Sequence, residues 1–149
     1  MSDITIRGNA SRRRKTSRGS MIVEAALIFP LFFIMLIGAF DFGQFLFIHQ
    51  ALVERARYAA RWGAVNNPAD STSITNVVLY LQSTAPPSGT GFLKLTASNV
   101  SVTNPDSGTA NYRLAIRISG YTYTVLSPYI AGTHIGPVIT VAVPLGLFN

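Results

Sequence analysis

The stretch MIVEAALIFPLFFIMLIGAF, residues 21–40, decides how the rest of the sequence is interpreted. Its only ionisable side chain is that of Glu24, and Asp41 follows it directly. About 20 helical residues rise about 30 Å, which matches the hydrocarbon core of a bilayer. The apolar side chains leave no polar face for water, unlike those of an amphipathic helix in a soluble protein. We therefore predict a membrane-spanning helix over this stretch.

The net charge of +6 is concentrated in the arm before the apolar run. Asp3 is the one acidic residue of this arm, against the basic residues Arg7, Arg12, Arg13, Arg14, Lys15 and Arg18. From Ser20 onward, basic and acidic residues nearly balance. The positive-inside rule places such an arm in the cytoplasm, with the C-terminal part of the chain outside. A basic arm can also bind phosphates, but no nucleic-acid partner is expected.

A cleaved secretory signal peptide is an alternative interpretation of the arm and the apolar run. Its hydrophobic part would be shorter, and a small-residue cleavage site would follow it. Gly38, Ala39 and Phe40 match such a site poorly. The apolar helix is therefore expected to stay attached. Cysteine is absent from the sequence, which excludes disulfides but does not report the compartment.

The helical pattern continues beyond the apolar run into a stem. One stripe repeats at helical spacing and contains Phe45, Ile48, Leu52, Ala56, Ala59 and Gly63. Asn66, Asn67 and Pro68 predict the end of the helix near Val65, because proline disfavours helical backbone in the preceding residue. The expected organisation is a cleaved basic leader (1–19), a transmembrane and periplasmic stem helix (20–65) and an extracytoplasmic α+β head (66–149).

The C-terminal part of the sequence predicts a short helix followed by a small antiparallel sheet. The helix is indicated by Ile74, Val77, Val78 and Leu81, with Ser71 or Ser73 as its expected N-cap. Alternating apolar residues predict a meander of about four strands near residues 100–102, 112–118, 121–125 and 138–143. Its apolar face is expected to pack on the stem helix. Tyr121, Tyr123 and Tyr129 are more typical of core or cross-strand positions than of an exposed patch.

The junction of arm and apolar run, RGSMIVE at residues 18–24, carries the most specific signal. A carboxylate inside a membrane helix costs about 2.5 to 3.5 kcal/mol when central and less near the interface, so Glu24 needs compensation. Cleavage after Gly19 would make Ser20 the first residue and would place its new amine four residues before Glu24. This spacing resembles the type IV prepilin processing site. The resemblance implies cleavage by a prepilin peptidase and neutralisation of a neighbouring subunit's N-terminal amine by Glu24.

The alternative is that Glu24 complements the dipole of its own helix and touches no neighbour.

A longer match extends the resemblance. The stretch VEAALIFP at residues 23–30, Gly38, DFG at 41–43 and QALVERARYAAR at 50–61 are similar to the TadE-like family. Ala25 departs from the family pattern, in which an aromatic residue is usual at this position. The resemblance implies an accessory, pilin-like component of the tight-adherence (Flp) pilus machinery. It leaves open what the C-terminal region binds.

Small residues and one proline of the long helix are candidate packing positions. Pro30 removes one backbone donor and frees the carbonyl of Ala26, which favours a local kink at a helix contact. Ala39 and Gly43 form a small-xxx-small pair. A second smooth strip on the stem consists of Ala56, Ala60 and Gly63. Both favour helix bundling, and helix propensity is the alternative reason for the alanines.

No catalytic cluster, cofactor or metal site is predicted from the sequence. His49 and His134 lie far apart and have no cysteine or paired carboxylates beside them. We expect a non-enzymatic minor pilin or pseudopilin in a bacterial inner membrane, acting in pilus assembly and adhesion. Its expected partners are prepilin peptidase, other pilin-like subunits, pilus assembly proteins and the lipid bilayer. The alternative is an unprocessed, signal-anchored periplasmic binding or sensor domain.

Overall fold

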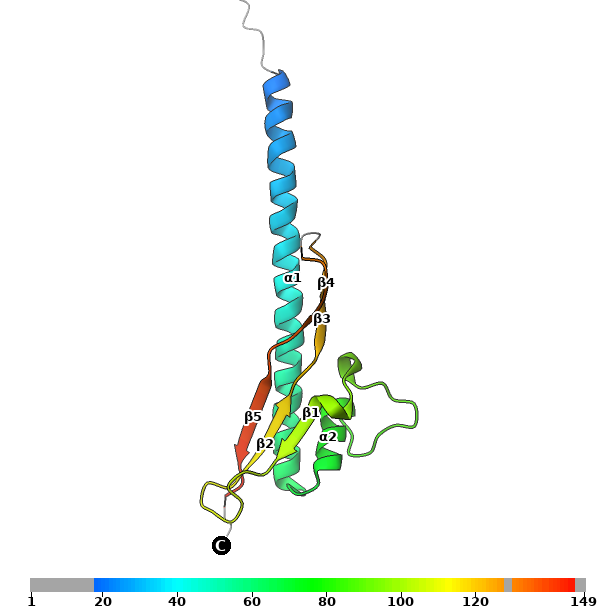
Figure 1. Ribbon diagram of the computed structural model, residues 1–149, viewed down its shortest axis with the longest axis vertical. Coiled ribbons are helices and arrows are strands. Elements are labelled where there is room, and N and C mark those ends of the chain that lie inside the picture. The colour runs from blue at the N-terminus through cyan, green and yellow to red at the C-terminus, as the bar shows by residue number, and fades with distance from the viewer. Residues whose placement is uncertain (1–17, 128–129, 147–149) are drawn as a thin grey trace, which may run out of the picture. The chain divides into compact units, whose positions relative to one another are not determined.

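The computed structural model describes residues 18–127 and 130–146 (Figure 1). These residues form two α-helices, two short 3-10 helices and five β-strands, which confirms the predicted α+β class. The chain divides after Leu36 into two units, and the second, Ile37–Asn149, is called the head unit below. Residues 1–17 of the predicted leader, with Arg7 to Lys15, and also Tyr129 lie outside the described residues.

Helix α1 runs from Arg18 to Val65 and contains both the apolar run and the predicted stem. Its predicted end is confirmed, because the helix stops where Asn66 begins the Asn-Asn-Pro sequence. The backbone amide of Asn66 donates to the carbonyl of Trp62 (3.0 Å), and the Asn66 side-chain amide donates to the same carbonyl (2.9 Å). The Trp62 carbonyl in the last turn of the helix therefore has hydrogen-bond donors, although carbonyls at a helix end often lack them.

Helix α2 runs from Ser71 to Tyr80 and is capped by a residue that differs from the predicted one. We expected Ser71 or Ser73 as the N-cap, and this was wrong. Asp70 is the N-cap, and its Oδ1 accepts a hydrogen bond from the backbone amide of Ser73 (3.0 Å). At the other end, Leu81 is the C-cap, with a left-handed backbone (φ 60°), and its side chain is exposed. Contrary to our prediction, Leu81 therefore does not belong to the apolar face of the helix.

The N-cap predicts a pH-dependent contribution to the stability of the head unit. Hydrogen bonds from Ser73, chiefly from its backbone amide, lower the pKa of Asp70 from its ordinary value of 3.8. A carboxyl whose pKa is lowered by folding stabilises the protein above the unfolded pKa, and this is lost as the pH falls through the folded pKa. Asp70→Ala should therefore lower the unfolding midpoint at neutral pH, and the difference from wild type should shrink below about pH 3.8.

Asp70→Asn is the control for this prediction, because asparagine caps helices well but does not titrate. Thermal unfolding of the full-length protein in detergent micelles, repeated over a pH series, measures both variants. A difference between wild type and Asp70→Ala that stays constant down to the acid limit would contradict the assignment.

The strands form two sheets, which corrects the predicted four-stranded meander. The first sheet has the order β1-β2-β5, with β1 at Val100–Thr103, β2 at Arg113–Ile118 and β5 at Ile139–Pro144. Both pairings are antiparallel, with Val102 opposite Ile116 and Ile116 opposite Val141. The second sheet is a two-stranded antiparallel ribbon of β3 (Thr122–Val125) and β4 (Gly132–Ile135), in which Tyr123 lies opposite His134.

The sequence analysis missed β4 and therefore the separate β3–β4 ribbon. Its residues Gly132 to Ile135 are all exposed and show no apolar alternation, so they carry no strand signal. Gly120 has a positive φ of 70°, which glycine adopts without strain, and it lies in the short link between β2 and β3. The strand after β2 thus leaves the first sheet, and β5 returns to pair with β2 instead.

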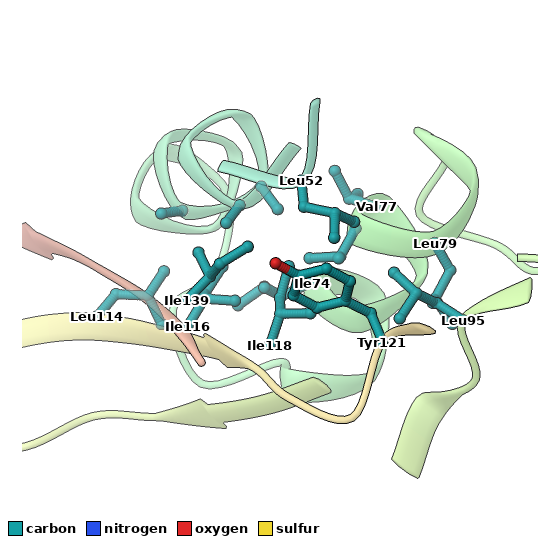
Figure 2. Packing of buried hydrophobic residues seen from close by; sticks show 14 of the residues in the cluster. Leu52, Ile74, Val77, Leu79, Leu95, Leu114, Ile116, Ile118, Tyr121 and Ile139 are labelled. Carbon is teal, nitrogen blue, oxygen red and sulfur yellow. The ribbon is translucent and has the colours of Figure 1, made fainter. Parts of the chain in front are cut away.

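One hydrophobic core joins the stem half of α1 to α2 and the first sheet. Figure 2 shows the side chains of α2 and the strands pointing toward the helix. The core residues include Leu52, Ala56, Ala59 and Ala60 of α1, Ile74, Val77 and Val78 of α2, and Leu114, Ile116, Ile118 and Ile139 of the sheet. On β2, Leu114, Ile116 and Ile118 are buried while Arg113 and Arg117 are exposed. The predicted packing of the sheet on the stem helix is confirmed. The two 3-10 helices, Phe92–Lys94 and Ala97–Asn99, connect α2 to β1.

Candidate functional site

The apolar run forms a helical surface that the described residues of the chain leave uncovered. Among the described residues, one helix is long and apolar enough to cross a membrane, with an 18-residue window of mean hydropathy 2.4 and none of that window buried. Leu27, Phe32 and Met35 are among its exposed apolar side chains. An exposed apolar surface of this size is stable in lipid and unfavourable in water. The helix is therefore consistent with a single-pass membrane anchor.

The residues of the predicted processing site lie at the start of α1. The peptide bond between Gly19 and Ser20 falls in the first turn of the helix, which begins at Arg18. A Cβ added to Gly19 would meet no atom within 4 Å, and Glu24 is exposed one turn further on. Pro30 lies inside the helix and is also exposed.

The two predicted packing strips of α1 have different surroundings. Ala39 and Gly43 are exposed, and a Cβ added to Gly43 would meet no atom within 4 Å. This strip is open to a neighbouring helix. Ala56, Ala60 and Gly63 are instead buried in the core of the head unit. A Cβ at Gly63 would approach Ile74 (2.7 Å) and Leu114 (2.8 Å), so this second strip packs on α2 and β2 of its own chain.

Asp41 has a role that the sequence analysis did not predict. We used it as the boundary of the apolar run, and its carboxylate also accepts two backbone hydrogen bonds. The amide of Leu126 donates to one oxygen (2.8 Å), and the amide of Ser127 donates to the other (2.9 Å). Hydrogen bonds to a charged acceptor are stronger than those between neutral groups. Asp41 thus fastens the end of β3 to helix α1.

A row of aromatic side chains continues this contact along α1. The rings of Phe45 and Tyr123 have centroids 5.0 Å apart, and Tyr123 lies 5.9 Å from His134. One turn beyond Phe45, His49 Nδ1 is hydrogen-bonded to the hydroxyl of Tyr121 (3.0 Å). Asp41, Phe45 and His49 follow one another at intervals of four residues, which places them on one face of the helix. That spacing was visible in the sequence, but their partners on the ribbon were not.

The tyrosines of this row are largely in the interior, as predicted. Tyr121 is buried and Tyr123 is half-buried. Burial, and to a smaller extent the neighbouring Tyr123, raises the pKa of Tyr121. The Tyr121 hydroxyl therefore remains protonated at neutral pH. The two histidines, which seemed unrelated in the sequence, lie at different points of one aromatic row.

Arg55 caps the C-terminal end of α2. Its guanidinium donates to the carbonyls of Val78 (3.3 Å) and Leu79 (3.4 Å), and it lies 3.8 Å from the ring centroid of Phe92. A cation near the last carbonyls of a helix is favoured by the helix dipole. Desolvation by burial lowers the pKa of Arg55 from its ordinary value. Arg55 thus joins the stem, α2 and the segment after α2.

Arg55→Ala should destabilise the head unit by about 1 to 3 kcal/mol, because it removes hydrogen bonds from a charged donor and a cation–π contact. Arg57→Ala is the matched control on the same helix. Arg57 pairs with Glu54 at 2.7 Å on the exposed face, and such pairs are worth about 0.3 to 0.5 kcal/mol. Denaturant unfolding in detergent, followed by the fluorescence of the single tryptophan Trp62, compares the two. Equal effects would contradict the role of Arg55.

The ionisable side chains of the described part of the chain do not gather into a metal-binding group. Within residues 18–127 and 130–146, no group of three or more His, Cys, Asp or Glu is placed to hold a metal ion. Asp41, Asp70 and Arg55 each bind backbone groups of the head unit, as described above for Asp41 and Arg55 and for the cap of α2.

The structure and the apolar surface together define a class of protein: an α+β protein with one helix suited to anchor it in a membrane. Comparison with known families is more specific. Residues 19–61 match the family model described as TadE-like protein, which confirms the resemblance seen in the sequence. The TadE-like family is a pilus-associated structural family, so the match suggests a protein associated with the tight-adherence pilus.

The family match covers most of α1 and leaves α2 and both sheets outside it. The searches of curated proteins and of solved structures returned no match to the chain.

Proposed function

We propose that this protein is a minor pilin or pseudopilin, anchored once in the bacterial inner membrane, that acts in assembly of a tight-adherence (Flp type IV) pilus and in surface adhesion. The observation that carries the proposal is the TadE-like match over residues 19–61 on a helix that begins with an uncovered apolar surface. The α+β arrangement of the described residues is compatible with a pilin-like head.

In the proposed topology, the basic arm stays in the cytoplasm and the chain from about Phe45 onward lies outside. The asymmetry of charge supports this orientation, because the arm before Ser20 carries half of the twelve basic residues. Residues 1–19 are a leader removed by a prepilin peptidase, residues 20–65 form the transmembrane and stem helix, and residues 66–149 complete the extracytoplasmic head.

The proposed partners of the membrane helix are the equivalent helices of other pilin-like subunits. Exposed Ala39 and Gly43 allow a neighbouring backbone to approach closely, and Pro30 supplies a site where a helix contact can form. The second strip, Ala56, Ala60 and Gly63, is occupied by the core of the head unit and takes no part. Bundling is therefore assigned to the part of α1 before Phe45.

Glu24 is the proposed assembly residue of the bundle. Once the bond after Gly19 is cut, Ser20 carries a free amine, and the Glu24 carboxylate of one subunit can pair with the amine of the next. The exposure of the Glu24 carboxylate leaves it accessible to a neighbouring subunit and supports this role.

Intact-mass analysis of the membrane-extracted protein tests the proposed function. We expect the mature chain to begin at Ser20 in cells with an active prepilin peptidase. Gly19→Val should retain residues 1–19, whereas Gly38→Val, a change to another glycine of α1 with no neighbouring atoms, should be processed normally. A wild-type chain that keeps its leader in such cells would overturn the proposal and favour a signal-anchored periplasmic binding or sensor domain.

A further inference from the structure

The β3–β4 ribbon ends in apolar side chains that the described residues leave exposed. Leu126, directly after β3, is 60% exposed, and Ile130, shortly before β4, is 61% exposed. The backbone amide of Ile130 donates to the carbonyl of Ser127 (3.2 Å), which holds the two sides of the turn together. We call Leu126, Ser127 and Ile130 the ribbon tip.

The sequence around the ribbon tip has no charged side chain that would keep it in water. Arg117 is the last Asp, Glu, Lys or Arg of the chain. Exposed turns of soluble domains are usually polar, so an uncharged turn with two exposed aliphatic residues suggests an apolar surrounding.

The position of the ribbon tip along α1 indicates what that surrounding is. Asp41 binds the amides of Leu126 and Ser127, and Phe45, one turn further along α1, contacts Tyr123. The ribbon runs beside α1 (Figure 1), and the two hydrogen bonds to Asp41 place its tip level with that residue. Asp41 is the residue that directly follows the apolar run, where the hydrocarbon core of a bilayer would end.

We propose that the ribbon tip is a second membrane contact, in which Leu126 and Ile130 enter the boundary between lipid headgroups and acyl chains. The proposal rests on the proposed insertion of residues 21–40 in the bilayer. Interfacial segments bury apolar side chains about 5 to 10 Å into this boundary. Contacts at two points, the helix and the ribbon tip, restrict rotation of α1 about its own axis and present one face of the helix to neighbouring subunits.

Asp41 makes this contact possible, because backbone amides near hydrocarbon need an acceptor. A strand end entering the interface would leave the amides of Leu126 and Ser127 without water, and the Asp41 carboxylate supplies both bonds. The same two bonds satisfy a carboxylate at the edge of the bilayer, where an unpartnered charge is unfavourable.

A protein partner fits the ribbon tip less well than lipid does. Stable protein–protein interfaces bury about 1,200 Å² or more in total, which two side chains of a narrow turn do not supply. A lipid interface has no such requirement, because each inserted side chain contributes separately.

Fluorescence quenching in the full-length protein tests the contact. The chain has no cysteine, so single cysteines can be introduced at Leu126 or Ile130 and labelled with an environment-sensitive fluorophore. The labelled protein is placed in vesicles of phosphatidylethanolamine and phosphatidylglycerol that carry nitroxides at shallow or deep positions of the acyl chain. We expect both labels to be quenched more strongly by the shallow nitroxide than by the deep one.

Two further labels make the outcomes distinguishable. Met35→Cys, in the apolar run, should be quenched most strongly by the deep nitroxide. Leu81→Cys, at an exposed leucine after α2, should not be quenched. If the Met35 label is quenched while the labels at 126 and 130 behave like that at 81, the membrane helix stands and the ribbon contact is overturned. If the Met35 label is not quenched, the proposed insertion fails and the ribbon contact fails with it.

A second copy of the chain is the competing occupant. In that case the label at 130 would become more shielded from water as the protein-to-lipid ratio rises, and neither nitroxide would quench it. This result would overturn the lipid assignment. Asp41→Ala should reduce quenching at 130 to the level seen at 81 while the Met35 label is unchanged. Unchanged quenching at 130 in this variant would overturn the role given to Asp41.

Discussion

Gly136→Ala is expected to destabilise the head unit by about 3 kcal/mol, the upper end of the usual range for overpacking a core. The amide of Gly136 donates to the carbonyl of Tyr121 (2.8 Å), so its backbone lies directly against that residue. A Cβ at this position would overlap the Tyr121 ring. Because Tyr121 is buried and its hydroxyl is hydrogen-bonded to His49, moving the ring away would disturb the core and break this bond.

Unfolding of the full-length protein in detergent, followed by Trp62 fluorescence, measures this effect. Gly146→Ala is the matched control, since an added Cβ there would meet no atom within 4 Å, and it should unfold like wild type. Tyr121→Leu should relieve the overlap, so Gly136→Ala should cost much less in that background than in the wild type. Additive effects of the two substitutions would show that the chain before β5 does not pack on Tyr121.

Glu24→Gln is expected to weaken association with other pilin-like subunits and to lower the number of pili, while leaving membrane level and head folding near normal. In a dry helix bundle, a glutamate paired with a neighbour's amine cannot be neutralised without leaving that amine unpaired. Breaking such a pair costs about 3 to 5 kcal/mol, equivalent to an association at least about 100-fold weaker. Co-purification of subunits and counts of pili per cell measure the two consequences.

Glu54→Gln is the control, because Glu54 is exposed on the same helix and pairs with Arg57 of its own chain. It should leave association and piliation unchanged. In the competing explanation, Glu24 interacts only with the dipole of its own helix. That interaction stabilises the helix by about 0.3 to 1 kcal/mol and does not affect binding to a neighbouring subunit. A Glu24→Gln strain with normal subunit association and normal pili would support that explanation and exclude the proposed assembly role.

Local patterns in the sequence were enough to predict the elements whose cause is local. The apolar run and its continuation at helical spacing predicted α1, and the Asn-Asn-Pro sequence predicted its end within one residue of Val65. The alternation of Leu114, Ile116 and Ile118 predicted β2 and its buried face. Hydropathy and periodicity act between near neighbours in the chain, which is why one sequence suffices to see them. The motif behind the family match is local for the same reason.

Tertiary packing decided the features that depend on distant partners. Ala56, Ala60 and Gly63 have the spacing of an intermolecular helix contact, yet the sheet and α2 of the same chain cover them. The strand β4 has no apolar alternation and exists because it pairs with β3. Asp41 looked like a boundary residue until two amides 85 and 86 residues away were found on its carboxylate. Small side chains, backbone amides and carboxylates accept many partners equally well, so their roles are settled by which segments the fold brings beside them.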